Sequence, residues 1–195
     1  MKTNLTRCSW ANTDNALLRD YHDHEWGRPC HNNRMLFELL SLEIMQAGLS
    51  WQTVLNKRQA LKAAFENFDY RTVQMLDSQL PQLLTNDKII RNRRKILAII
   101  SNARIIDSLE TQNKSFNQYL WDFIKWTPIQ HHYQSHKDLP RTDQTARQIS
   151  KQMKSDGFKF TGPVVIYSFM QAAGLVNDHE ISCYRYKEIT KTHEQ

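Results

Sequence analysis

The chain has 195 residues, of which 40% are apolar and 10% aromatic, enough for a packed core without disulfide staples. It has no run of eighteen apolar residues, and its first ten residues lack the pattern of a signal peptide, so we predict a cytoplasmic protein without a membrane-spanning helix. Twenty-six Lys and Arg against 20 Asp and Glu give a net charge of +6, which fits either a polyanionic partner or a merely basic surface.

The sequence predicts an all-α fold, because Gly and Pro are few and apolar residues recur at three- and four-residue spacing. In chain order, the expected helices are residues 12–21, 34–47, 51–65, 71–75, 81–85, 94–107, 116–123, 143–156 and 163–173. Residues 126–143 combine two prolines with turn formers and predict an irregular crossing between two helical groups. Its histidines, His131, His132 and His136, have no matching cysteine or acidic partner nearby, and we expect them in a solvated loop.

Histidine and cysteine residues near the two ends of the sequence suggest a metal site. In "NDHEISCY", His179 lies four residues before Cys183, which on a helix places an imidazole and a thiol on one face. Cys8 and His22 supply the same two ligand types and complete a tetrahedral set of the closed, structural kind. Competing ligands are His24 and Cys30. The alternative is a group of ordinary buried cysteines and surface histidines, which spacing alone does not exclude; the odd cysteine count argues against a disulfide framework.

A carboxylate interrupts the apolar stripe of the helix expected at residues 34–47. Glu43 falls among Leu36, Leu39, Leu40 and Ala47 at helical spacing, whereas Glu38 lies off the stripe and is expected in solvent. A buried carboxylate must be paired, protonated or face a cavity. Pairing with an arginine and a role in a binding site are equally compatible with the pattern.

Four aromatic residues lie beside these features in the sequence: Trp10, Tyr21, Trp26 and Trp51. Aromatic residues most often belong to a core. A cavity walled by them, with one buried acid at its base, would also suit a flat cationic ring held by stacking and cation–π attraction.

The stretch "NDKIIRNRRK" predicts a turn before a long helix that opens beside four cations, Arg91, Arg93, Arg94 and Lys95. Cations at a helix N-terminus oppose the macrodipole unless an anion binds there. A phosphate held by free backbone N–H groups and these side chains is one interpretation, and a solvated basic face is the other.

Taken together, five blocks resemble the DNA-3-methyladenine glycosylase I (Tag) family of the helix-hairpin-helix superfamily. They are "RCSW", "YHDHEWG", "LFELLSLEIMQAGLSW", "IIRNRRKILAIISNAR" and "GFKFTGPVVIYSFMQAAGLVNDHEISC". The blocks run from Arg7 to Cys183 in the family's order, so the resemblance covers nearly the whole chain.

The resemblance assigns roles to individual residues. The zinc ligands of the family match Cys8, His22, His179 and Cys183, which implies one structural Zn²⁺ per chain joining the terminal segments. Residues that contact the excised base match Glu43, Tyr21 and Trp51, with Trp10 and Trp26 as further pocket candidates. The loop that wedges into the duplex matches Gly48 and Leu49, and the phosphate-gripping hairpin matches the region of Arg91, Arg93 and Lys95. Lys88 stands where the family's hairpin usually has glycine.

The implied architecture is a single glycosylase unit, residues 1–195, of two helical lobes: a helix-hairpin-helix lobe at roughly 34–125 and a zinc lobe from the terminal segments. The implied activity is hydrolysis of the N-glycosidic bond of 3-methyladenine in alkylated duplex DNA by a monomer, which releases the free base and leaves an abasic site. We expect no strand cleavage, since no lysine is matched to a Schiff-base nucleophile. The rival from another class is a zinc-stabilised, non-enzymatic binder of alkylated or distorted DNA; a zinc hydrolase would need an open coordination position.

Overall fold

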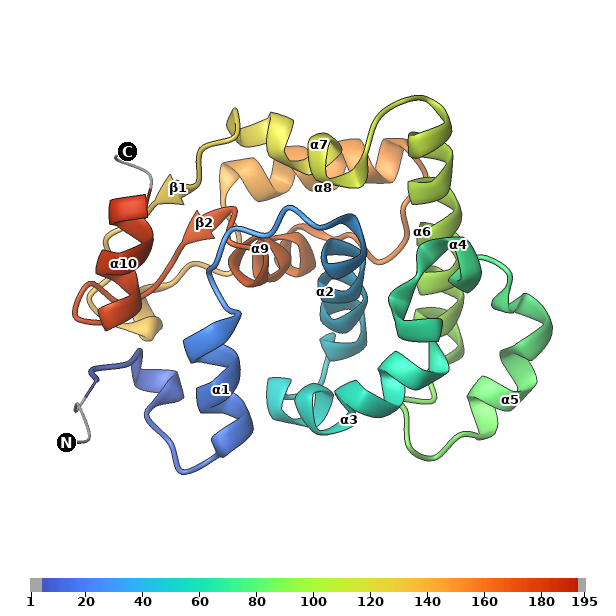
Figure 1. The fold of residues 1–195 in the computed structure, drawn as a ribbon, viewed down its shortest axis with the longest axis horizontal. Helices are drawn as coiled ribbons and strands as arrows, with labels where there is room; N and C mark the ends of the chain where they lie inside the picture. The colour runs from blue at the N-terminus through green and yellow to red at the C-terminus, as the bar shows by residue number, and fades with distance from the viewer. Residues whose placement is uncertain (1–4, 193–195) are drawn as a thin grey trace.

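The structure, a computed structural model, describes residues 5–192, whose regular structure is mostly helical (Figure 1). The α-helices are α1 (Ala16–His24), α2 (Asn33–Gln46), α3 (Trp51–Ala64), α4 (Tyr70–Val73), α5 (Leu80–Thr85), α6 (Arg93–Thr111), α7 (Phe116–Trp121), α8 (Gln144–Ser155), α9 (Pro163–Ala172) and α10 (Tyr184–Thr192). The 3-10 helices are η1 (Ser9–Ala11), η2 (Glu66–Phe68), η3 (Leu76–Gln79), η4 (Asp122–Ile124) and η5 (His136–Asp138). Two short strands, β1 (Ile129–Gln130) and β2 (Val176–Asn177), pair in parallel.

Capping side chains set where many of these helices begin. The caps are Asn15, Asn32, Ser50, Asn92, Ser115 and Asp143, whose side-chain oxygens accept hydrogen bonds from backbone N–H groups of the first turn. The nine predicted helices are confirmed, although the first begins at Ala16 rather than residue 12 because Asn15 caps it. Helix α10 and the strand pair were not predicted.

Helix α2 is the centre of the fold. Every residue from Leu36 to Met45 is buried, because α3, α6, α7 and α9 surround the helix (Figure 1). A helix covered on all sides has no solvent face, so both of its acids, Glu38 and Glu43, lie in the interior.

The two terminal segments lie side by side (Figure 1). The backbone N–H of Tyr184 donates to the carbonyl of Thr6 at 2.9 Å, and the guanidinium of Arg7 pairs with Asp23 of α1 at 2.7 Å. This arrangement brings η1, α1 and the segment before α10 together at one end of the molecule. Within residues 5–192, no helix is both long enough and apolar enough to cross a membrane.

Candidate functional site

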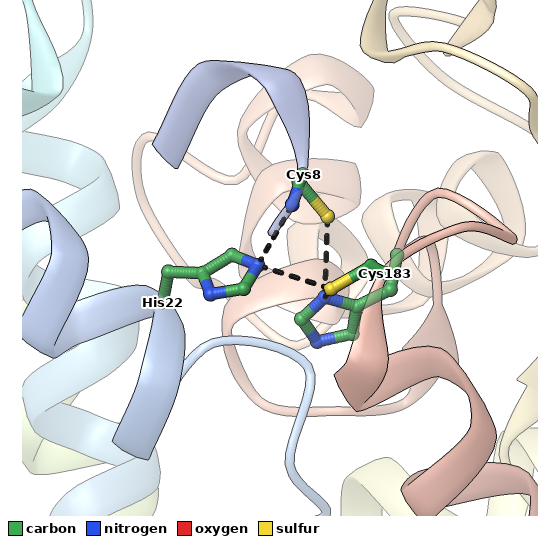
Figure 2. A group of neighbouring side chains, drawn as sticks. Cys8, His22 and Cys183 are labelled. Carbon is green, nitrogen blue, oxygen red and sulfur yellow. Dashed lines mark hydrogen bonds between the residues drawn. The ribbon is translucent and has the colours of Figure 1, made fainter. Parts of the chain in front are cut away.

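The four predicted metal ligands converge from three chain segments. Cys8 precedes η1, His22 lies in α1, and His179 and Cys183 lie in the turns between β2 and α10, not on a helix as the spacing argument assumed. All four side chains are buried, and their ligand atoms lie within 4.8 Å of one another. Figure 2 shows the Cys8 and Cys183 sulfurs beside the His22 ring. The competing residues lie elsewhere: His24 is exposed against Asp20, and Cys30 is outside the group.

The spacing of these atoms fits a four-coordinate ion. Around a tetrahedral zinc ion, a sulfur and a nitrogen ligand lie about 3.5 Å apart. Here the Cys8 Sγ to His179 Nδ1 distance is 3.3 Å, and Cys183 Sγ lies 3.4 Å from His22 Nε2 and 3.7 Å from His179 Nδ1. The buried cluster could therefore hold a metal ion without rearrangement.

The far nitrogen of each imidazole has a partner that fixes its orientation. His22 Nδ1 lies 2.8 Å from the Asp23 carboxylate, and His179 Nε2 lies 3.1 Å from the Trp26 carbonyl oxygen. A ring that donates its N–H to these acceptors presents the lone pair of its other nitrogen to the cluster. Gly27 packs on the His179 ring so closely that a Cβ at this position would lie 2.7 Å from Nε2.

The two thiols lie close enough to affect each other's pKa. The neighbouring Cys183 and burial raise the pKa of Cys8 far above its usual value. The neighbouring Cys8, with the His179 and His22 rings acting against burial, lowers the pKa of Cys183. Thiolates are the form in which cysteines bind metals, so a cation bound here would have to displace the proton of Cys8.

Beside the cluster lies a cavity of about 290 Å³, near the lower end of small-ligand pockets. Its walls come from the N-terminal segment, α1, α2, α3, α9 and η5, and its lining residues are Trp10, Leu18, Tyr21, Trp26, Glu43, Gln46, Trp51, His136, Ser168 and Gln171. The structure thus gathers all five predicted base-pocket residues around one cavity. Five further lining residues were missed. Four are isolated polar residues on α2 and α9 and a loop histidine, which carry no periodic signal, and the fifth, Leu18 of α1, looks like an ordinary helix residue.

Glu43 is the buried acid of this cavity. Among residues 5–192, its side chain has no arginine partner and its Oε2 atom makes no hydrogen bond, and the residue is 5% exposed. Burial raises the pKa of Glu43 from 4.5 to about 8, so at neutral pH most molecules carry a protonated carboxyl there. Of the two interpretations of Glu43, the structure thus favours the one in which it faces a cavity.

Aromatic rings form the walls around this acid. Trp10 meets Trp26 edge to face with ring centroids 5.1 Å apart, and Tyr21 lies 5.0 Å from Trp51. The Trp51 indole Nε1 is buried without a hydrogen-bond partner. Burial, with the nearby Glu43 charge, raises the pKa of the Tyr21 hydroxyl well above its usual value, so this group stays neutral. The cavity therefore offers flat apolar faces and a few unused polar atoms.

Glu38 corrects one expectation. It was expected in solvent, yet it is 3% exposed and its Oε1 atom accepts a hydrogen bond from Arg58 Nε at 2.8 Å. Lys62 lies 3.3 Å from its other oxygen. Glu38 is thus the paired structural acid of α2, one and a half turns from the unpaired Glu43.

The predicted wedge residues lie on the short loop between α2 and α3, beside the cavity residue Trp51. Gly48 has a φ of +80°, and a Cβ built there would meet no atom within 4 Å. Its conformation turns the chain so that Leu49 is 42% exposed, with its backbone N–H donating to the Gln46 carbonyl at 2.6 Å. An apolar side chain is therefore presented to solvent at the edge of the cavity.

The basic turn before α6 is only partly as predicted. Arg91 and Arg93 are exposed, but Lys95 is 5% exposed. The Lys95 ammonium donates to the carbonyl oxygens of Met45 at 2.9 Å and Ala47 at 2.6 Å, at the C-terminal end of α2. The prediction of Lys95 as a phosphate ligand is therefore wrong in this structure; a cation here satisfies orphan carbonyls and complements the helix dipole.

A second hairpin lies next to this turn. Residues 156–162 connect α8 to α9, which pack against each other, and α9 begins with no capping side chain at Gly162. Asn102 of α6 exchanges two hydrogen bonds with the Lys159 backbone, at 3.0 Å and 2.7 Å, and Arg94 stacks 5.7 Å from the Phe160 ring. The start of α6 and this hairpin are therefore in contact, which was not predicted.

Comparison with known proteins gives a consistent assignment. A model of the methyladenine glycosylase family matches residues 10–186. DNA-3-methyladenine glycosylase 1 of Escherichia coli (strain K12) is 40% identical over 183 residues, which are 93% of this chain and 97% of that protein. A crystal structure of 3-methyladenine DNA glycosylase I (TAG) superimposes with a TM-score of 0.88 at 42% identity, covering 92% of this chain and 98% of that one. The Staphylococcus aureus 3-methyladenine DNA glycosylase I, solved to explain 3-methyladenine recognition, gives 0.86 at 37% identity over 92% and 96%. The chain belongs to the methyladenine glycosylase family.

Proposed function

We propose that this chain hydrolyses the N-glycosidic bond of 3-methyladenine in alkylated duplex DNA, releasing the free base and leaving an abasic site. The observation that carries the proposal is the unpaired, buried carboxyl of Glu43 inside a cavity walled by Trp and Tyr rings. Adenine methylated at N3 is cationic while attached to DNA, and it leaves as a neutral molecule, so its glycosidic bond is already weak. The enzyme must therefore mainly select and position this base.

Glu43 acts in this proposal as the residue that recognises charge. At neutral pH, ionising it in the empty cavity costs about 1.4 kcal/mol, because its pKa is about 8. A cationic ring stacked on Trp51 beside Glu43 offsets this cost by direct attraction, whereas neutral adenine does not. The cavity therefore favours the methylated base over the normal one.

The base reaches the cavity by eversion from the duplex. Leu49 is placed to fill the gap that the everted base leaves, since it is apolar, exposed and at the edge of the cavity. Arg91 and Arg93, together with the α8–α9 hairpin beside them, form the surface proposed to hold the phosphate backbone, with backbone N–H groups at the start of α9 and the exposed Lys159 as further donors.

The Cys8, His22, His179 and Cys183 cluster is proposed to bind one structural Zn²⁺. Two thiols and two imidazoles are the usual zinc ligands, and a shell closed by four protein atoms leaves no position for a reactive water. The ion would tie the terminal segments together. Metal analysis should give about one zinc per chain, and Cys183→Ala should lower both the zinc content and Tm. Metal-free protein with unchanged Tm would contradict this role.

Among the described residues that line the cavity there is no lysine, which supports a monofunctional enzyme without a Schiff-base step. The test is incubation of the protein with methylated duplex and with the same duplex unmethylated. Free 3-methyladenine and alkali-labile sites should come from the methylated duplex alone. Binding without base release would instead identify a non-enzymatic binder, and strand breaks without alkali would contradict the monofunctional mechanism. The two-lobe division, the monomeric state and the cytoplasmic location stay predictions.

A further inference from the structure

Glu180 joins two chain segments that are far apart in the sequence. It directly follows His179 and is 6% exposed. Its Oε1 atom accepts hydrogen bonds from the Ser9 hydroxyl at 2.6 Å and from the His136 backbone N–H at 2.8 Å. Its Oε2 atom accepts one from the Ser9 backbone N–H at 3.0 Å. One carboxylate therefore holds both the N-terminal segment and the loop that contains η5.

Both segments contribute a wall to the cavity. Trp10, next to Ser9, packs on Trp26 and lies 6.5 Å from Tyr21. His136 lines the same cavity but is exposed, whereas Glu43 is 5% exposed. The η5 turn is further fixed by a capping box between Ser135 and Asp138. The two walls thus differ in depth: Trp10 is half-buried, and His136 stands at the mouth.

We propose that Glu180 is a positioning residue for base excision, which sets Trp10 against the base and His136 against the sugar–phosphate of the everted nucleotide. This proposal rests on the proposed glycosylase function. A nucleotide that enters base first places its ring beside the buried Glu43 and leaves its sugar and phosphate at the mouth. An imidazole there donates to a phosphate oxygen or packs on the sugar.

The two contacts predict different readouts for two variants. His136→Ala leaves its backbone bond to Glu180 intact, so it should leave the affinity for free 3-methyladenine unchanged and raise KM for methylated duplex about fivefold to tenfold, with kcat nearly unchanged. Glu180→Gln keeps an acceptor for the Ser9 hydroxyl and His136 but turns an NH₂ group toward the Ser9 N–H. It should weaken free-base binding about tenfold, through Trp10, as well as raising KM for the duplex.

The experiment measures free-base affinity by tryptophan fluorescence, single-turnover base release, zinc content and Tm for the wild type, both variants and their double mutant. Glu110→Gln is the matched control, because the Glu110 carboxylate also accepts several hydrogen bonds, from Asn33, Tyr70 and Arg71, and none of these residues lines the cavity. The control should match the wild type in base affinity and KM. If Glu180 acts through His136, the duplex KM effects of the two variants are less than additive in the double mutant.

Several outcomes would overturn the proposal. If Glu180→Gln keeps one zinc and binds the free base as tightly as the wild type, Glu180 does not position Trp10. If His136→Ala has an unchanged KM for methylated duplex, His136 does not contact the nucleotide. If Glu180→Gln loses zinc, Ser9→Ala replaces it, since this variant removes one of the three bonds without altering Glu180; normal base affinity there also overturns the proposal. A wild type that releases no base contradicts the proposed function itself, whereas an active wild type with variants that match it contradicts only this inference.

Discussion

Replacing Glu43 by Gln is expected to stabilise the folded protein at neutral pH while weakening its hold on a cationic base. Burial raises the pKa of this carboxyl from 4.5 to about 8, so the folded chain keeps a proton that the unfolded chain releases above pH 4.5. The contribution of Glu43 to the free energy of unfolding therefore falls by about 1.4 kcal/mol for each pH unit between these two values and is level above them. At neutral pH, Glu43 has therefore lowered the free energy of unfolding by on the order of 3 kcal/mol relative to pH 4.5. A Gln side chain has no proton to lose, so it does not cause this loss.

Urea unfolding of both proteins over a series of pH values, without DNA or base, measures this difference. The other titrating groups are shared and cancel when the wild-type free energy of unfolding is subtracted from that of the variant. The difference should be near zero at about pH 4.5, grow steadily, and level off above about pH 8. In a separate binding assay at neutral pH, affinity for methylated duplex, in which the base is still cationic, should fall in the variant. A difference that does not change with pH would refute the reasoning. The two proteins would then take up the same number of protons on folding, and Glu43 would not have a raised pKa.

Three further predictions concern residues outside the cavity. Unlike Glu43→Gln, Glu38→Gln should lower the free energy of unfolding, by about 1–3 kcal/mol, because Arg58 loses a charged partner. Urea unfolding at neutral pH checks this, and a stabilised variant would contradict the pairing. Lys95→Met should destabilise the folded protein by about 1–3 kcal/mol and raise KM for methylated duplex, because the carbonyls of Met45 and Ala47 beside the Leu49 loop lose their donor. Unchanged Tm and KM would show that these hydrogen bonds are dispensable. Arg93→Ala should reduce the slope of log affinity against log salt by about 1 for any duplex, measured by fluorescence anisotropy; an unchanged slope would remove Arg93 from the phosphate contacts.

The helices were predictable because their signals are local. A polar cap such as Asn92 or Asp143 and an apolar spacing of three and four residues can be found in a short window of sequence. The same method misplaced Glu38, because a periodic stripe predicts burial on one face only. Helix α2 is covered on all sides, and only the tertiary arrangement reveals this.

The site was predictable where residue type alone restricts the chemistry. Two cysteines and two histidines suggested a metal site, but distance in the sequence left His24 and Cys30 as competitors until the fold separated them from the cluster. Lys95 was misjudged because a charge beside a helix start was expected in solvent, whereas its long side chain reaches another helix's carbonyl oxygens. His136 was dismissed with its loop, since nothing in its neighbours indicates that Glu180, 44 residues later, draws it to the cavity.

The contact between the terminal segments also bears on the timing of biosynthesis. Cys8 and His179 are 171 residues apart, so the ribosome must add all of these residues before the N-terminal ligand meets its partner. At typical elongation rates this takes on the order of ten to thirty seconds. Throughout that interval Trp10 has no fixed place against the cavity, and a nascent or truncated chain carries Glu43 and Leu49 without the aromatic wall that Trp10 adds. The complete cavity thus forms only after residues 179–183 have been synthesised.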